Sequence, residues 1–341
     1  MTLPAQMHAL IQLHDGYAST QTGPDIQDLS PFVALQQIDV PRPGPGEALI
    51  KVHLAAVNPS DIHFIKGEYG QPRVQGRPAG FEAVGEVIAG DTPLIGQRVS
   101  FFATASGTWA EYAVTDAQRL VPCRPDLSEP DAAGQLVNPL TAIAMFDIVA
   151  ESGADSFVLN AAGSQLGKLL IGLGRDKGIK PIAVVRRMAQ AELLKELGAA
   201  AVIATDQPNA LGQAEELFQS LKPRVLLDAV GDQFTADLFF AMPSHTRWVN
   251  YGKLSTDAPA LANLGQMIFQ NKRIEGFWLT RWMQQVDPER IPQAFAEIQA
   301  RFVAGQWRTD VAGIVPLPQA MTQLPQVLAQ PDGKAFIDPR L

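Results

Sequence analysis

The sequence predicts an α/β protein of two domains, a mostly β, barrel-like domain and a domain built on a doubly wound parallel sheet. Two observations carry this prediction. Short strands punctuated by Pro and Gly dominate residues 1 to about 125, whereas strands alternate with helices from residue 157 onward. A chain of 341 residues also exceeds what one hydrophobic core usually supports. We expect the β domain at 1–127, completed by 280–341, and the α/β domain at 128–279.

The β domain is predicted from segments in which apolar and polar residues alternate. Residues 47–57 alternate in this way after a Pro- and Gly-rich turn at 41–46. Three further strands are expected at 83–89, 97–102 and 109–114. Many short strands separated by turns are typical of a compact, barrel-like domain.

The α/β domain is predicted from a change of period after Pro125. Residues 131–150 carry apolar side chains at helical spacing, and short apolar strands then alternate with helices. Such alternation favours a parallel sheet covered by helices on both faces. The expected strands are 157–159, 181–185, 201–203, 225–230, 247–251 and 274–279, and the expected helices are 189–197, 212–221 and 292–304.

Residues 155–187 carry the most information about function. The apolar strand 157–159 leads into a turn of small residues at 160–167 (NAAGSQLG), and a helix and a second strand follow. This is the order of a dinucleotide-binding βαβ unit, in which backbone N–H groups at the helix start bind the pyrophosphate. Only Gly163 and Gly167 remain of the usual glycine pattern, so an ordinary βα turn stays open as an alternative.

Two arginines follow the second strand of this unit. An Asp or Glu at that point would hydrogen-bond the free ribose 2′-OH of NAD, whereas Arg186 and Arg187 suit the 2′-phosphate of NADP. The alternative is a pair of solvated surface charges. Together with the glycine turn, the arginines favour NADPH as the cofactor.

The composition excludes several classes of protein. A net charge of −8 and a pI near 5.2 argue against a nucleic-acid partner. No apolar run is long enough to span a bilayer, and the N-terminus lacks the pattern of a signal peptide. The single Cys123 excludes an internal disulfide and a cysteine-based metal cluster. We expect a cytoplasmic enzyme with a small-molecule substrate and no membrane partner.

Several local motifs resemble those of a known family. They are 56–61 (AVNPSD), 80–87 (GFEAVGEV), 138–142 (NPLTA), 65–70 (IKGEYG), 249–253 (VNYGK) and 276–282 (GFWLTRW). With the βαβ unit, they make the chain similar over nearly its whole length to the medium-chain dehydrogenase/reductase superfamily. The last three are most similar to the zinc-independent, mitochondrial-type 2-enoyl thioester reductases, with quinone oxidoreductases as near relatives. The resemblance implies a GroES-like β domain and a Rossmann domain that binds NADPH.

The same resemblance argues against a metal site. Zinc-dependent members carry a Gly-His-Glu motif where residues 80–82 of this chain read Gly-Phe-Glu. A phenyl ring cannot ligate zinc, and the four cysteines of a structural zinc loop are missing. His53, His63 and Cys123 form no ligand pattern. We therefore expect no bound metal.

Without a metal, a protein acid must assist the reduction of an activated double bond. Hydride adds to the β-carbon, negative charge builds on the conjugated oxygen, and the α-carbon then takes a proton. A tyrosine hydroxyl can serve as the general acid, and the resemblance implies this role for Tyr69. The alternative is a half-buried loop tyrosine whose hydroxyl caps a backbone group.

The resemblance also implies a set of cofactor contacts. Some of these residues have an ordinary alternative. Asn138 suits a helix start before Pro139, Lys334 alone reads as a surface lysine, and Phe277 and Trp278 also suit an apolar strand at the edge of the sheet. The implied cofactor residues are Asn138, Gly163, Ser164, Gln165, Leu166, Arg186, Arg187, Tyr251, Gly252, Phe277, Trp278, Leu279 and Lys334.

The sequence therefore predicts an NADPH-dependent reductase of activated carbon–carbon double bonds, with 2-enoyl thioesters as the expected substrates. An NADPH:quinone oxidoreductase on the same scaffold and a non-catalytic NADPH-binding sensor are the alternatives. Tyr69 and the segment 276–282 favour catalysis over sensing. The apolar last strand of the sheet, near 274–279, predicts a homodimer formed by strand pairing across a two-fold axis.

Overall fold

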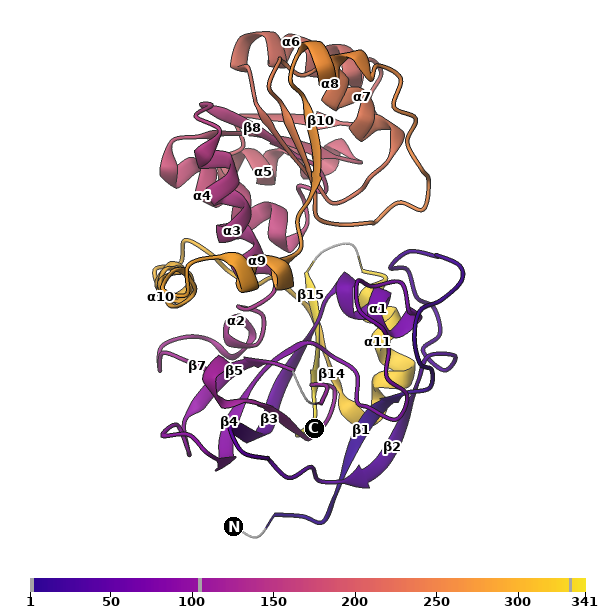
Figure 1. Ribbon diagram of the computed structural model, residues 1–341, viewed down its shortest axis with the longest axis vertical. Helices are drawn as coiled ribbons and strands as arrows, with labels where there is room; N and C mark the ends of the chain where they lie inside the picture. The colour runs from indigo at the N-terminus through magenta and orange to yellow at the C-terminus, as the bar shows by residue number, and fades with distance from the viewer. Residues whose placement is uncertain (1–2, 104–105, 331–332) are drawn as a thin grey trace. The chain divides into compact units, whose positions relative to one another are not determined.

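The computed structural model describes residues 3–103, 106–330 and 333–341 (Figure 1). The chain forms two compact units. The first combines Met1–Val137 with Phe295–Leu341, and the second is Asn138–Ala294. The C-terminal segment therefore returns to the unit in which the chain begins.

The first unit is built around a seven-stranded sheet in the order β14-β15-β3-β4-β5-β7, with β6 paired to β3. β1 and β2 form a separate antiparallel pair. The strand β15 comes from the end of the chain and pairs antiparallel with β3, so the tail completes this sheet. The strands are β1 Gln6–Gln12, β2 Val33–Asp39, β3 Glu47–Val57, β4 Glu82–Gly90, β5 Arg98–Phe102, β6 Tyr112–Asp116, β7 Val121–Pro122, β14 Val311–Pro316 and β15 Lys334–Asp338.

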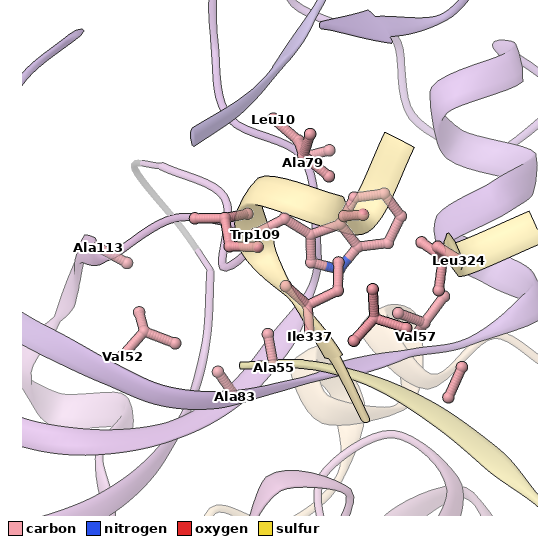
Figure 2. Packing of buried hydrophobic residues seen from close by; sticks show 14 of the residues in the cluster. Leu10, Val52, Ala55, Val57, Ala79, Ala83, Trp109, Ala113, Leu324 and Ile337 are labelled. Atoms are coloured by element: carbon pink, nitrogen blue, oxygen red, sulfur yellow. The ribbon is translucent and has the colours of Figure 1, made fainter. Parts of the chain in front are cut away.

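The core of the first unit gathers around Trp109. Its indole is fully buried, and Figure 2 shows it among side chains from β3 and β4, with Leu324 of α11 and Ile337 of β15 close by. Its ring N–H donates to the carbonyl of Ala56 at 3.4 Å, which satisfies the polar end of the buried ring. The helices of this unit are α1 Pro59–Lys66, α2 Glu129–Ala133 and α11 Ala320–Leu328, and α10 Arg290–Val303 leads into it from the second unit.

The second unit contains a six-stranded, all-parallel sheet in the order β10-β9-β8-β11-β12-β13. The strand order reverses between β8 and β11, which makes the sheet doubly wound, as predicted. Its strands are β8 Ser156–Leu159, β9 Lys180–Val185, β10 Ala201–Ala204, β11 Val225–Asp228, β12 Arg247–Asn250 and β13 Arg273–Gly276. Its helices are α3 Asn138–Glu151, α4 Gln165–Lys177, α5 Ala191–Leu197, α6 Ala210–Leu221, α7 Gln233–Ala241, α8 Gly265–Phe269 and α9 Leu279–Gln285.

Several predicted elements differ in extent from those observed, and two of the differences have a clear cause. The single helix expected at 131–150 is two helices, α2 and α3, because the amides of Leu136 and Val137 donate to the Glu82 carboxylate instead of continuing the helix. The last strand expected at 274–279 ends at Gly276. Trp278 is then the N-cap of α9, so the apolar run is divided between a strand and a helix start.

One buried carboxylate joins the strands at the centre of the parallel sheet. Asp228, at the end of β11, is fully buried. Its Oδ2 accepts hydrogen bonds from the ring N–H of Trp248 and from Nδ2 of Asn250, both at 2.8 Å on β12. Its Oδ1 accepts from Nδ2 of Asn160, which follows β8, and from the amide of Val230 at 2.8 Å. The strand expected at 225–230 therefore stops at Asp228, because the next amides turn back to its side chain.

We predict that Asp228→Asn lowers the free energy of unfolding by about 1–3 kcal/mol. The carboxylate accepts hydrogen bonds at both oxygens, whereas the asparagine amide must turn its NH₂ group toward some of the same donors. Urea denaturation followed by tryptophan fluorescence measures the change, since Trp248 is one of the affected donors. The control is Asp206→Asn, an exposed residue in the same unit, which should change stability by less than about 0.5 kcal/mol. Equal effects of the two substitutions would contradict the structural role of Asp228.

Candidate active site

The glycine turn connects β8 to the N-terminus of α4. Ser164 is the N-cap of α4, and its Oγ accepts the amide of Gly167 at 3.1 Å. A Cβ at position 167 would lie 2.5 Å from the carbonyl oxygen of Ala162, so a side chain cannot fit there. A Cβ at position 163 would lie 2.4 Å from Oε1 of Gln190. Backbone contact therefore requires glycine at position 167, whereas the neighbour of Gly163 is the tip of a glutamine side chain that can move.

The glycine that the usual pattern would place at position 165 is replaced by a residue on the helix itself. Gln165 is the first helical residue of α4, and its side chain is only half-buried. No close contact of the kind seen at Gly167 therefore demands glycine at this point. The turn keeps the geometry of an anion-binding helix start even though the pattern of glycines is incomplete.

Four groups of predicted cofactor residues lie along one edge of the parallel sheet. Strands that run parallel end at the same edge, and these residues follow the ends of β8, β9, β12 and β13. They are 163–166 after β8, the exposed Arg186 and Arg187 after β9, Tyr251 and Gly252 after β12, and Phe277, Trp278 and Leu279 after β13. Ligands of open α/β sheets bind at this carboxyl edge, where the strand order reverses.

Tyr251 turns its hydroxyl inward. The oxygen is buried, and among the described residues no hydrogen-bond partner satisfies it. Burial raises the pKa of the Tyr251 phenol, and the negative charge of Asp228 raises it further. Tyr251 therefore stays neutral at physiological pH.

The remaining predicted residues lie elsewhere. Asn138 is the first residue of α3 in the second unit. Tyr69 and Lys334 belong to the first unit. The alternative reading of Lys334 as a surface lysine is wrong, because only 5% of the residue is exposed. Its Nζ donates to Oδ1 of Asn58 and to Oε1 of Glu82, the latter at 3.4 Å.

The loop that carries Tyr69 is anchored immediately before the tyrosine. The Glu68 carboxylate accepts the backbone amide of Thr22 at 2.7 Å, its hydroxyl at 2.9 Å and the amide of Gly23 at 3.1 Å. Lys66 donates to the carbonyl of Gly23 at 2.6 Å. Gly67 closes α1 with φ of 77°, and a Cβ there would lie 2.7 Å from the amide nitrogen of Ala18. The backbone immediately before Tyr69 is therefore held by several contacts.

The Tyr69 ring is half-buried against two phenylalanines. Its centroid lies 6.4 Å from that of Phe64, edge to face, and 5.2 Å from that of Phe81. Phe81 stands at the middle position of the Gly-Phe-Glu motif, so the residue that cannot bind a metal instead supports the tyrosine ring. An aromatic wall of this kind orients a phenol and excludes water from one of its faces.

Glu82, the residue after Phe81, belongs to a cluster of buried polar side chains that the sequence alone did not reveal. Asn58, Asp61, Glu82 and Lys334 are all at most 5% exposed. Burial raises the pKa of Asp61 to about 7, against the opposing hydrogen bond from the amide of Asn58 and with a further increase from the charge of Glu82. Asn58 and Glu82 belong to motifs that marked the family resemblance, but no local pattern shows which polar residues will meet inside a fold.

Comparison with known proteins identifies the family. A zinc-binding dehydrogenase model matches residues 166–300, and an alcohol dehydrogenase GroES-like domain model matches residues 44–126. A crystal structure from Mesorhizobium loti is 47% identical, with 99% of this chain and 100% of that chain covered and a TM-score of 0.95. Its name assigns it provisionally to the NADPH:quinone reductases. The chain belongs to the medium-chain dehydrogenase/reductase superfamily.

Other members of the superfamily are more distant. The mitochondrial enoyl-[acyl-carrier-protein] reductase of Bos taurus is 27% identical over 331 residues, which cover 94% of this chain and 85% of the relative. A mutant enoyl thioester reductase from Candida tropicalis is 22% identical, with 98% and 99% of the two chains covered and a TM-score of 0.79. At that identity the second comparison shows the fold alone.

Membership of the superfamily confirms the predicted fold class, a GroES-like β unit with a Rossmann unit. The family model that matches residues 166–300 is named for zinc-binding dehydrogenases. Within residues 3–103, 106–330 and 333–341, no three His, Cys, Asp or Glu side chains are grouped as metal ligands.

No helix in those ranges is long and apolar enough to cross a membrane.

Proposed function

We propose that this superfamily member is an NADPH-dependent reductase that acts on 2-enoyl thioesters. The observation that carries the proposal is the anchored Tyr69, whose ring packs on Phe64 and Phe81 in a loop held by Glu68. The names of the curated relatives support the same substrate class. The Rossmann unit serves as the cofactor domain, and the GroES-like unit supplies the catalytic tyrosine.

The turn after β8 fits a dinucleotide. Gly167 leaves no room for a side chain, because a Cβ there would meet the backbone of Ala162, so backbone amides at the start of α4 can approach the pyrophosphate closely. Arg186 and Arg187 are exposed at the end of the adjacent strand β9, where guanidinium groups can bind the 2′-phosphate. The other proposed contacts are Ser164, Gln165, Leu166, Tyr251, Gly252, Phe277, Trp278 and Leu279 on the same edge of the sheet, with Asn138 at the start of α3. When bound, NADPH supplies the hydride that is added to the β-carbon.

Tyr69 supplies the proton. As hydride reaches the β-carbon, negative charge develops on the thioester oxygen and the α-carbon becomes basic. The phenol hydroxyl stabilises this charge by hydrogen bonding and then protonates the α-carbon as a general acid. The anchored loop matters because a general acid is effective only when its geometry is held before the transition state.

Quinone reduction is the second candidate, favoured by the name of the Mesorhizobium loti relative at 47% identity. The product oxygens of a hydroquinone can take protons from water, so this reaction does not depend on Tyr69. NADPH oxidation with crotonyl thioester, a long-chain enoyl thioester and a quinone separates the candidates. Turnover of the thioesters supports our proposal, turnover of the quinone alone supports the second candidate, and NADPH binding without any turnover indicates a sensor.

We also propose that the protein forms a homodimer through β13, the outer strand of the Rossmann sheet. The sequence Arg273-Ile274-Glu275 is self-complementary, since antiparallel pairing about a two-fold axis at Ile274 places each arginine opposite the glutamate of the second copy. The neighbouring helix α8 exposes 75% of Ile268 and 85% of Phe269. Such exposure is unusual for large apolar side chains, and it supports the proposal that a second copy of the chain covers this surface.

Replacement of Arg186 and Arg187 by alanine should weaken NADPH binding at least about tenfold, because charge-assisted hydrogen bonds to the 2′-phosphate contribute about 1.5–3 kcal/mol. NADH binding should change little. Fluorescence titration with both cofactors measures the difference. Lys180→Ala, which removes a charge at the opposite end of β9, is the matched control. An equal loss of affinity for NADPH and NADH would show that the pair does not recognise the 2′-phosphate.

Tyr69→Phe should lower kcat for crotonyl thioester by about 10²-fold or more while the Kd for NADPH stays unchanged, because the hydroxyl acts mainly in the transition state. The ring remains, so packing on Phe64 and Phe81 should be preserved. Steady-state kinetics on the thioester and a quinone test this, with Tyr17→Phe as an exposed control. A mutant that reduces the thioester at the wild-type rate would falsify the role of Tyr69.

Arg273→Glu should convert the dimer to a monomer at micromolar concentration, because glutamates then face each other across the two-fold axis. The double variant Arg273→Glu/Glu275→Arg should restore the dimer, since the pairs are re-formed with reversed sign. In the wild type, Nε of Arg247 on β12 donates to Glu275 at 2.7 Å, and in the double variant Arg247, which lies opposite position 273, can pair with the new glutamate instead. Light scattering of the three proteins measures the assembly. A wild-type monomer, or a double variant that stays monomeric, would argue against this pairing.

A further inference from the structure

The Glu82 carboxylate is fully buried and accepts hydrogen bonds from four donors in three other chain segments. Oε2 accepts the backbone amides of Leu136 at 3.0 Å and Val137 at 2.8 Å. Oε1 accepts Nδ2 of Asn58 at 2.9 Å and Nζ of Lys334 at 3.4 Å. The strand β4, the N-cap of α1, the segment before α3 and the strand β15 therefore meet at one side chain.

Stability alone does not account for this arrangement. Removing a carboxylate and an ammonium from water costs several kcal/mol for each ion, and a well-packed apolar pair often replaces such a buried ion pair without loss of stability. The Lys334 ammonium is satisfied by both Asn58 and Glu82, and Asn58 in turn bridges the two charges. What an apolar pair could not do is bind two backbone amides in a defined direction.

The two amides belong to the last residues before the chain passes from the GroES-like unit to the Rossmann unit. Val137 is the last residue of the GroES-like unit before the crossing, and Asn138 begins both the Rossmann unit and the 14-residue helix α3. Glu82 thus holds the backbone immediately before the chain enters the cofactor domain. Asn138, the next residue, is one of the proposed cofactor contacts.

The same glutamate is adjacent in sequence to the wall of the catalytic tyrosine. Glu82 begins β4, and Phe81 directly before it packs against the Tyr69 ring at 5.2 Å between centroids. Because Glu82 is held by four donors, the backbone position of Phe81 is constrained as well. The Glu82 carboxylate therefore constrains two features: the ring that supports the proposed proton donor, and the backbone just before the cofactor domain.

We propose that Glu82 is a positioning residue of the reductase, which orients the chain into Asn138 and supports Tyr69 through Phe81, with Lys334 as its buried counter-ion. This inference rests on the proposed function. It assigns Lys334 to a role inside the GroES-like unit, where its ammonium neutralises Glu82, in place of a direct cofactor contact.

Glu82→Gln tests the proposal, because the amide keeps the shape but turns its NH₂ group toward donors. We expect kcat for crotonyl thioester to fall about tenfold or more, and amide hydrogen exchange at residues 136 and 137 to accelerate. Glu86→Gln, on the same strand with a half-buried side chain, is the matched control and should leave both readouts at wild-type values.

A double variant that removes both members of the Glu82–Lys334 ion pair separates positioning from folding. Lys334→Met alone leaves Glu82 without its counter-ion and should lower the melting temperature, whereas Glu82→Gln/Lys334→Met removes both charges and should regain much of it. If Glu82 positions the chain, kcat of the folded double variant stays low and exchange at 136 and 137 stays fast. A folded double variant with wild-type kcat, KM and exchange overturns the inference.

The experiments distinguish a failure of this inference from a failure of the proposed function. If the wild-type protein reduces no activated double bond, the proposed function fails, and the exchange experiment with NADPH titration still decides whether Glu82 orients the segment before Asn138. If the wild type reduces enoyl thioesters and Glu82→Gln matches it in rate and exchange, the function stands and the positioning role is overturned.

Discussion

Buried carboxylates must be surrounded by hydrogen-bond donors, and this requirement organises both units of the protein. In the GroES-like unit, Glu82 collects donors from β15, from the N-cap of α1 and from the segment before α3. In the Rossmann unit, Asp228 collects donors that follow β8 and β11 or lie on β12. Each acid therefore determines where neighbouring elements end, because amides that would continue a helix or strand turn toward the carboxylate instead.

The proposed chemistry needs no metal, because we assign the role of the acid to Tyr69. Zinc would polarise the substrate oxygen as a Lewis acid. Phe81 stands where zinc-dependent members carry a histidine, and its ring centroid lies 5.2 Å from that of Tyr69, the residue that we propose as the acid. The loop contacts of Glu68 and Lys66 hold the backbone immediately before the tyrosine.

Periodicity predicted most elements and failed where tertiary contacts intervene. The strand expected at 47–57 is β3 with the same bounds, although most of its residues are buried on both faces of the sheet. The helix expected at 131–150 is broken near Gly134, and the strand expected at 274–279 ends at Gly276. Both errors lie in apolar runs, in which period alone does not show where hydrogen bonds to distant segments begin.

The sequence by itself determined the two fold types, the glycine turn, the arginine pair and the absence of a histidine at position 81. These features are local, since each depends on residues close together in the chain. Only the tertiary structure decided that Lys334 is buried beside Glu82 and that Glu68 anchors the Tyr69 loop. Lys334 and Glu82 are 252 residues apart, and no local pattern encodes a pairing that arises only when β15 joins the sheet that contains β4.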